Sequence, residues 1–395
     1  MAARLSRNVV AIGAVSFLTD VATEMIYPLL PVFLSTVLGA NASFIGAIEG
    51  VAESTAALLK LAGGWWSDKV KKRKPLIVAG YFIATVARPF TAMAQTATQV
   101  LLIRLTDRIG KGIRTAPRDA LLADSVEPEA RGRAFGFHAA MDNAGAVLGP
   151  LIAFALIRYY DISLRNVFWL AAIPGALAFI VLVVAVKEIQ ASAPAPSKDK
   201  ADLSSPDQLG RRFWAYLVVV LLFTLGNSTD AFLLLRANQL GVAIALAPIL
   251  WVVLNLVKTL LGTWAGGLSD RVGRKPLIVA GWLLYAAVYF LFARASAPWH
   301  AWALFGTYGI FYALTEGTEK ALVADLVPET RRGSAYGWFN LAVGLGALPA
   351  SLIFGAIWDR MGAPVAFTFG AALALTAAIG MTIVAPSRPR AAVAR

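Results

Sequence analysis

The strongest constraint on the fold is a basic segment that occurs twice in the chain. Residues 67–80 (SDKVKKRKPLIVAG) return as residues 269–281 (SDRVGRKPLIVAG), and the last seven residues of the two copies are identical. Each copy lies between two long apolar stretches. A second pair of similar segments, 120–136 and 321–337, has the same spacing. The two pairs of similar segments predict a duplicated unit in which a short basic loop joins two membrane-spanning helices.

The composition agrees with a membrane protein. Of the 395 residues, 58% are hydrophobic and only 15% are charged, whereas charged residues make up about a quarter of a soluble domain. The absence of Cys excludes disulfides and thiol chemistry, and with only two His it argues against a transition-metal site. We therefore expect no metal and no cofactor. The net charge of +13 lies in short loops, which indicates the anionic surface of a bilayer as its partner, and no nucleic acid.

Apolar stretches of about 20 residues or more predict an all-α membrane protein with two six-helix bundles, residues 1–187 and 212–395. Residues 188–211, rich in Pro, Ala, Ser and charge, are expected to form a linker between them. Residues 1–17 resemble a signal peptide but continue without a cleavage site, so they are interpreted as part of the first span. The twelve predicted helices are 8–37, 43–66, 75–95, 98–122, 131–159, 163–187, 212–238, 243–268, 276–297, 299–323, 331–359 and 363–386.

Basic residues indicate how the helices are oriented. The loop after the second predicted helix carries five Lys and Arg between positions 69 and 74, whereas the loops near Gly39 and Thr96 carry none. Because basic loops stay on the cytoplasmic side, we expect a multi-pass protein of the inner membrane with both termini in the cytoplasm. All twelve spans lie in one polypeptide without a coiled-coil seam, so a monomer is expected.

The 6+6 arrangement, the linker and the basic loop together resemble the major facilitator superfamily. The loop motif reads Gly64-x-x-x-Asp68 in the first copy and Gly266-x-x-x-Asp270 in the second, and the first copy has Lys71 where the family has Gly. The family arrangement implies that each Asp lies at a helix N-terminus of the opposite half, where free N–H groups favour an anion. The alternative is a solvated loop that only sets topology. The residues expected to gate transport are Asp68, Arg73, Asp270, Arg271 and Arg274.

The helix predicted at 131–159 carries a second resemblance. Gly136, Gly145, Gly149 and Pro150 have the spacing of the motif of the drug:proton antiporter branch, although Ala153 stands where that motif has another Gly. The resemblance implies antiport. Small residues also allow helices to approach closely, so a packing role is the alternative.

Charged residues within the predicted helices are candidates for function, because a charge inside a membrane is costly without a partner or a water-filled cavity. Asp20 and Glu24 lie on one face of the first helix, and Glu49 and Glu53 on one face of the second. These four acids are candidates for a coupling proton. The alternative is that they form static ion pairs with cations of helix 98–122. The expected substrate cavity comprises Tyr27, Arg88, Arg104, Arg108, Lys111, Asp142, Asn143, Asn227, Asp230, Asn255, Lys258, Glu316 and Asn340.

The sequence contains no G-x-x-x-x-G-K-[ST] loop, so nucleotide hydrolysis is not expected to supply energy. We expect a secondary transporter, not an enzyme: a proton-coupled antiporter that exports a small organic solute by alternating access. One alternative is an organic-anion carrier whose substrate site is the cationic cluster of helix 98–122. A lipid scramblase or a membrane enzyme is a more remote alternative, and no nucleophile with an adjacent base supports an enzyme. The substrate stays open, because fold does not fix function.

Overall fold

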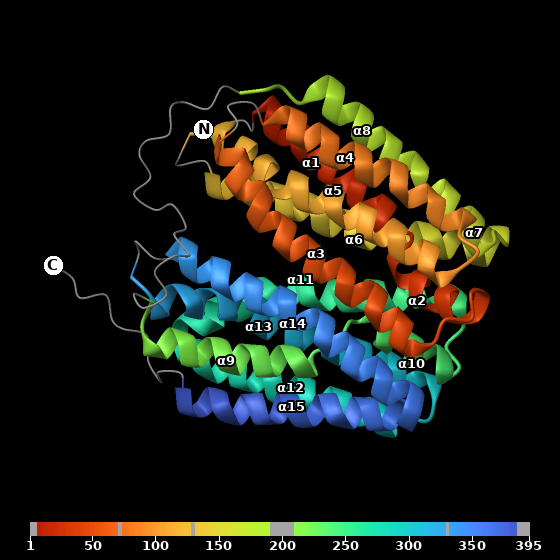
Figure 1. Cartoon of the computed structure of the whole chain (residues 1–395), viewed down its shortest axis with the longest axis vertical. Coiled ribbons are helices and arrows are strands. Elements are labelled where there is room, and N and C mark those ends of the chain that lie inside the picture. Colours follow the sequence, from red (N-terminus) through yellow and green to blue (C-terminus); the bar gives the residue numbers. More distant parts are fainter. Residues whose placement is uncertain (1–5, 70–72, 128–130, 190–208, 329–331, 385–395) are drawn as a thin grey trace. The chain divides into compact units, whose positions relative to one another are not determined.

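The chain forms two compact units of helices (Figure 1). The computed structural model describes residues 6–69, 73–127, 131–189, 209–328 and 332–384, with the side chains of 61, 63–69, 131–132, 263 and 332–334 left out. All regular elements in these ranges are helical, as the sequence predicted. Unit 1 comprises Met1–Ala40, Val51–Ala195 and Ala243–Val252, and unit 2 comprises Asn41–Gly50, Pro196–Val242 and Val253–Arg395.

The helical elements up to position 189 are α1 (Arg7–Glu24), η1 (Tyr27–Leu29), α2 (Leu30–Val32), η2 (Phe33–Val37), α3 (Ala42–Lys69), α4 (Lys74–Ala87), η3 (Arg88–Met93), α5 (Ala97–Asp124), α6 (Arg131–Tyr160), α7 (Leu164–Leu170) and α8 (Ala172–Ala185). Those that follow are α9 (Arg211–Gly226), α10 (Ala231–Gln239), η6 (Ile244–Leu246), α11 (Ala247–Val272), α12 (Arg274–Arg294), α13 (Pro298–Leu326), α14 (Arg332–Met361) and α15 (Ala363–Val384).

Ten stretches within the described residues are long and apolar enough to cross a membrane. The other two long helices, α5 and α13, have 28 and 29 residues. At 1.5 Å per residue both helices are long enough to span a membrane, but both contain several charged side chains. An all-α membrane fold is confirmed, and the count of twelve spans stays a prediction with which these helices are compatible.

The first helix of each half is broken, so the helices predicted at 8–37 and 212–238 are interrupted, although Arg7–Val37 and Arg211–Gln239 each remain long and apolar enough for one membrane span. The α1 helix ends at Glu24 and is followed by short 3₁₀, α and π turns. Pro28 and Pro31 remove two backbone donors there. The break between α9 and α10 falls on the polar run 227–230, whose side chains compete for backbone hydrogen bonds. The prolines and the polar run are local signals that the prediction of continuous helices passed over.

Two further predicted helices differ in a similar way. The helix predicted at 75–95 changes to a 3₁₀ helix at Arg88, just before Pro89. The helix predicted at 163–187 breaks at Ala171 and ends at Ala185. Pro174 has no N–H to bond the carbonyl one turn earlier, which accounts for the break.

Glycines set the closest helix contacts in unit 1, where α4 packs on α5 and α1 packs on α6 and α8. A Cβ on Gly80 would lie 2.6 Å from the Gly110 carbonyl oxygen, and one on Gly110 would lie 2.5 Å from that of Gly80. The backbones of α4 and α5 therefore touch. On α6, a Cβ on Gly145 would lie 2.6 Å from the Phe17 carbonyl oxygen, and one on Gly149 would lie 2.7 Å from the Val21 carbonyl oxygen. Two glycines of the antiporter-like motif thus bring α6 against α1.

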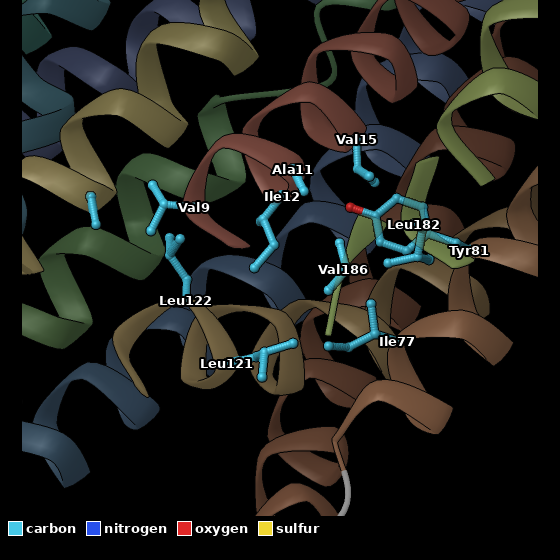
Figure 2. Close-up of a cluster of buried hydrophobic side chains, with 11 residues drawn as sticks. Val9, Ala11, Ile12, Val15, Ile77, Tyr81, Leu121, Leu122, Leu182 and Val186 are labelled. Atoms are coloured by element: carbon cyan, nitrogen blue, oxygen red, sulfur yellow. The ribbon is translucent and has the colours of Figure 1, made fainter. Parts of the chain in front are cut away.

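An apolar cluster joins the ends of the same helices (Figure 2). It combines side chains of α1, α4, α5, α6 and α8 with Val186 just beyond α8. Tyr81 is its largest member, and all of its residues are buried. The members are Val9, Ala11, Ile12, Val15, Ile77, Tyr81, Leu121, Leu122, Ala134, Leu182 and Val186. The cluster fixes one end of unit 1 without any polar group in its interior except the tyrosine hydroxyl.

We predict that Gly110→Ala destabilises the protein, because the added methyl group overlaps the α4 backbone, and overpacking of this kind costs about 1–3 kcal/mol. Gly136→Ala is the matched control, since a Cβ at that helical position meets nothing within 4 Å. It should leave stability unchanged or slightly raise it. Thermal unfolding in mild detergent compares the two variants. Equal midpoints would contradict the backbone contact between α4 and α5.

Candidate functional site

The charged residues of α5 lie in the interior of unit 1. Arg104, Asp107, Arg108 and Arg114 are all less than 9% exposed. They recur at helical spacing and so share one side of α5. Buried guanidinium groups stay ionised and need compensating partners. The site is therefore described by the partners that each of these cations has.

The central ion pair joins Arg88 of η3 to Asp107 of α5. The Nε of Arg88 donates to Oδ1 of Asp107 at 2.8 Å, and its Nη1 donates to the Thr19 carbonyl oxygen at 3.4 Å. Both side chains are buried. Arg108 also approaches the second oxygen of Asp107, at 3.8 Å. One carboxylate thus compensates two arginines, and Arg88 links η3 to both α5 and α1.

The second copy fills the matching positions with aromatic residues. By the alignment of the repeats, Tyr289 stands where the first copy has Arg88, and Tyr308 where it has Asp107. Both tyrosines are fully buried, with ring centroids 6.2 Å apart. Tyr285 stacks on Tyr289 with a centroid distance of 4.1 Å. The two copies share a backbone plan but fill the same place with charge in unit 1 and with rings in unit 2.

The four candidate proton acids differ in their partners. Glu53 pairs with Arg108 at 3.5 Å, and its side chain is 52% exposed. Glu24 accepts a hydrogen bond at 2.7 Å from the indole Nε1 of Trp251, which lies in the part of α11 that belongs to unit 1. Among the residues that the structure describes, Asp20 and Glu24 have no cation within 4.0 Å. Glu49 is buried and belongs to the segment Asn41–Gly50 of unit 2.

Longer-range electrostatics still connect Asp20 and Glu24 to α5. The Asp20 carboxylate interacts with the charges of Asp142 and Lys111. Glu24 interacts with Asp20 and Lys111, and Glu53 also interacts with Lys111. Lys111 is therefore the cation shared by three of the four acids. A change in charge on one acid alters the field that the others experience.

The remaining predicted cavity residues of unit 1 lie around the same acids. The Tyr27 ring is 5.0 Å from the Trp251 ring, and the Arg104 guanidinium lies 5.6 Å from the Tyr27 centroid. Asp142 lies 3.4 Å from Nδ1 of His138, whose Nε2 is 2.8 Å from the Ser16 hydroxyl. Asn143 is exposed on α6.

The predicted residues of unit 2 form two polar groups. Asp230, at the start of α10, accepts hydrogen bonds from the hydroxyls of Tyr308 and Tyr312 at 2.8 and 2.9 Å. Lys258 pairs with Glu316 at 2.8 Å and lies 5.0 Å from the Tyr312 ring centroid. Of the three predicted asparagines, Asn227 ends α9, Asn255 is half-buried on α11 and Asn340 is exposed on α14.

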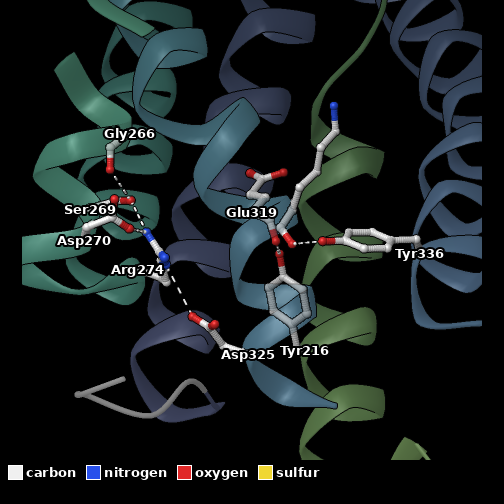
Figure 3. A network of polar contacts seen from close by, with 9 residues as sticks. Tyr216, Gly266, Ser269, Asp270, Arg274, Glu319, Asp325 and Tyr336 are labelled. Carbon is white, nitrogen blue, oxygen red and sulfur yellow. Dashed lines mark hydrogen bonds and ion pairs between the residues drawn. The ribbon is translucent and has the colours of Figure 1, made fainter. Parts of the chain in front are cut away.

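The predicted gating loops make the same ion pair in both copies. Arg73 pairs with Asp124, and Arg274 pairs with Asp325 at 3.3 Å, with 51 positions between the partners in each case. Figure 3 shows that Arg274 also bonds Asp270 and so links α11, α12 and α13. These pairs lie within single units.

The other gating predictions stand as follows. Arg271 is exposed. Asp68 ends up on α3, outside the residues whose side chains are described. The predicted approach of Asp68 and Asp270 to helix N-termini of the opposite half stays a prediction.

Sequence reasoning missed two long-range contacts. Glu188, expected at the start of the linker, accepts hydrogen bonds from the backbone N–H groups of Arg73 and Lys74 at 3.1 and 2.8 Å and so caps α4. The Trp251 indole, which holds Glu24, lies 227 positions away in the chain. Neither partner carries a local sequence signal, because both contacts are long-range. The described residues contain no group of three or more His, Cys, Asp or Glu that could hold a metal ion.

We predict that the Arg88–Asp107 pair behaves as a unit. Asp107→Asn alone leaves the buried Arg88 uncompensated and should cost about 3–5 kcal/mol of stability. The double variant Arg88→Met with Asp107→Leu removes both charges and should cost much less than the sum of the two single changes. Thermal unfolding of both single variants and the double variant measures the coupling. Additive losses would mean that the two charges do not depend on each other.

Comparison with known proteins agrees with this geometry. The family model described as "Major Facilitator Superfamily" matches residues 12–347 and 231–394. An uncharacterized MFS-type transporter of Methanocaldococcus jannaschii is 35% identical over 94% of this chain and 93% of its own. The multidrug resistance protein MdtH of Photorhabdus laumondii is 26% identical over 82% of this chain and 79% of its own. The crystal structure of a D-xylose-proton symporter has the same fold, with a TM-score of 0.74 at 17% identity over 96% of this chain and 97% of its own. A match that covers almost the whole chain means that this protein belongs to the Major Facilitator Superfamily of membrane transporters.

Proposed function

We propose that the protein is a proton-coupled antiporter that exports a small organic solute, with Asp20 and Glu24 of α1 as the proton-binding acids. The observation that carries the proposal is the hydrogen bond from the neutral Trp251 indole to Glu24, in a unit where other acids are paired with arginine. Transport by members of this family is established by the comparisons, whereas antiport, its direction and the proton are our proposal.

The acids of unit 1 have different partners, and these partners indicate which acids can bind and release a proton. Protonation of Asp107 would leave the buried Arg88 without its carboxylate, and protonation of Glu53 would remove one of the two carboxylates that compensate Arg108; both changes are unfavourable. Protonation of Glu24 leaves no such charge within 4.0 Å among the described residues, and the indole N–H can donate to either form of the acid. Burial favours the neutral form of a carboxylic acid, so a site without a fixed cation can exchange a proton at lower cost.

Coupling follows because Asp20 and Glu24 both interact electrostatically with Lys111. When Asp20 and Glu24 are ionised, they compensate part of the positive charge of α5. When they bind a proton, that charge becomes available to a solute. Proton and solute then compete for one set of charges, which is the thermodynamic requirement for exchange. Gly145 and Gly149 hold α6 against α1 next to both acids, so a structural change in α1 at these acids is transmitted directly to α6.

The relatives give supporting information. MdtH, similar along most of its length, is a multidrug resistance protein, and export of an organic solute fits that likeness. We further propose that the chain acts as a monomer in the inner membrane, with both termini and the repeated basic loops in the cytoplasm.

A specific observation also favours an organic-anion carrier as the second candidate. Arg114 is buried, and within the described part of the chain its Nε and Nη1 have no hydrogen-bond partner, as is also true of Nε of Arg108. Arg114 lies 4.0 Å from the Tyr81 ring centroid, which satisfies its charge only in part. Unused guanidinium donors suit a carboxylate or phosphate group of a substrate.

The test is transport into liposomes with an imposed pH gradient, first with the wild-type protein against a panel of cationic, neutral and anionic solutes. With a transported solute in hand, Asp20→Asn and Glu24→Gln should still exchange solute across the membrane but lose the drive from the gradient, because the amide mimics the protonated acid. Glu53→Gln is the matched control: it should lower the unfolding temperature and leave the surviving protein gradient-driven. Asp20 and Glu24 variants that are both driven as well as the wild type would exclude these acids as the proton site.

A further inference from the structure

A second acid in the chain is held as Glu24 is, but in unit 2. Glu319 lies on α13, and its Oε1 accepts a hydrogen bond at 2.8 Å from the indole Nε1 of Trp282 on α12. Its backbone carbonyl accepts a hydrogen bond at 3.4 Å from the hydroxyl of Tyr216 on α9 (Figure 3). Trp282 and Tyr216 are both 0% exposed. Two buried aromatic side chains thus fix this acid between α9 and α12.

Among the side chains that the structure describes, none with a positive charge lies close to Glu319. The neighbouring acid, Glu316, pairs with Lys258 at 2.8 Å and with Lys320 at 4.0 Å. Within the described ranges, Glu319 has no cation within 4.0 Å. The charges that act on it come from Glu316 and Lys320 of its own helix. The groups facing it from neighbouring helices are the neutral Trp282 and Tyr216, while Tyr336 of α14 bonds the Lys320 carbonyl oxygen.

This environment differs chemically from that of Glu316. A proton on Glu316 would leave the ammonium group of Lys258 without its carboxylate. A proton on Glu319 leaves no such charge, because the indole N–H can donate to a carboxylate or to the carbonyl oxygen of a carboxylic acid. Trp282 therefore keeps the acid in place in both protonation states.

The repeat indicates that Glu319 is not part of the shared scaffold. The matching position of the first copy is Arg118, which pairs with Asp119 at 2.8 Å. Trp282 likewise stands where the first copy has Tyr81. If this position only supported the fold, the residues of either copy would serve. A carboxylic acid with an indole donor, however, occurs at this position in the second copy alone. An ionisable side chain in the interior of a transporter's helix is by default a functional candidate.

We propose that Glu319 is a second proton-binding site, so that the protein binds one proton in each unit. The proposal extends the proton coupling proposed above but does not depend on which acid of α1 carries the first proton. The carboxylate takes up a proton to give the neutral acid and releases it again as a proton, while Trp282 holds Oε1 throughout. A transporter with two such sites can move two protons for each solute.

The test reads protonated carboxyl groups directly and needs no solute. Infrared difference spectra between acidic and alkaline buffer record the C=O stretching band of protonated acids in the purified protein. Glu319→Gln should reduce the intensity of this band by the contribution of one carboxyl group. Glu316→Gln, one turn away, is the matched control and should leave the band unchanged, because its acid stays ionised beside Lys258. Trp282→Phe should keep the intensity but raise the C=O frequency, because the acid loses its hydrogen-bond donor.

The outcomes separate this inference from the proposed function. A band that is intact in Glu319→Gln but reduced in Glu24→Gln would overturn the second site and leave the first in place. A band reduced in Glu319→Gln but intact in Glu24→Gln would support the second site and exclude Glu24 as the first. If Glu319→Gln does not fold, the Trp282→Phe spectrum decides: an unchanged C=O frequency overturns the proposal.

Discussion

The structure of unit 1 depends on the compensation of charge inside a helix bundle. A guanidinium group cannot lose its proton, so every buried arginine of α5 must have a partner. Asp107 serves two of them, Arg88 and Arg108, at 2.8 and 3.8 Å. The close packing of α4 on α5 through Gly80 and Gly110 keeps these partners within reach. Because such pairs are fixed by electrostatics and by packing at once, they are poor places for a proton to enter or leave.

Duplication gave the two halves one backbone plan, and divergence gave them different interiors. The ion pair at the basic loop is retained in both copies, as Arg73 with Asp124 and Arg274 with Asp325. Deeper in the helices, the slot that holds an ion pair in unit 1 holds buried tyrosines in unit 2. The same backbone position therefore carries charge in unit 1 and aromatic rings in unit 2.

Tryptophan has a particular role in this arrangement. Glu24 and Glu319 each accept one indole N–H, at 2.7 and 2.8 Å, whereas Glu53 and Glu316 are paired with cations. A neutral donor fixes the position of an acid without fixing its charge. An arginine or lysine at the same distance would hold the acid in its ionised form. In our proposal, the choice of partner separates acids that maintain the structure from acids that exchange a proton.

The repeat, the apolar lengths and the charge pattern determined much by themselves: the all-α membrane fold, the family resemblance and the concentration of charge on residues 97–124. These are local or periodic properties, and a chain carries them wherever it folds. Only the tertiary structure decided which acids are paired. Asp20, Glu24, Glu49 and Glu53 look equivalent in the sequence, yet Glu53 faces Arg108 while Glu24 faces an indole 227 positions away. The capping of α4 by Glu188 was decided in the same way, because a hydrogen bond between distant segments depends on packing that no local pattern records.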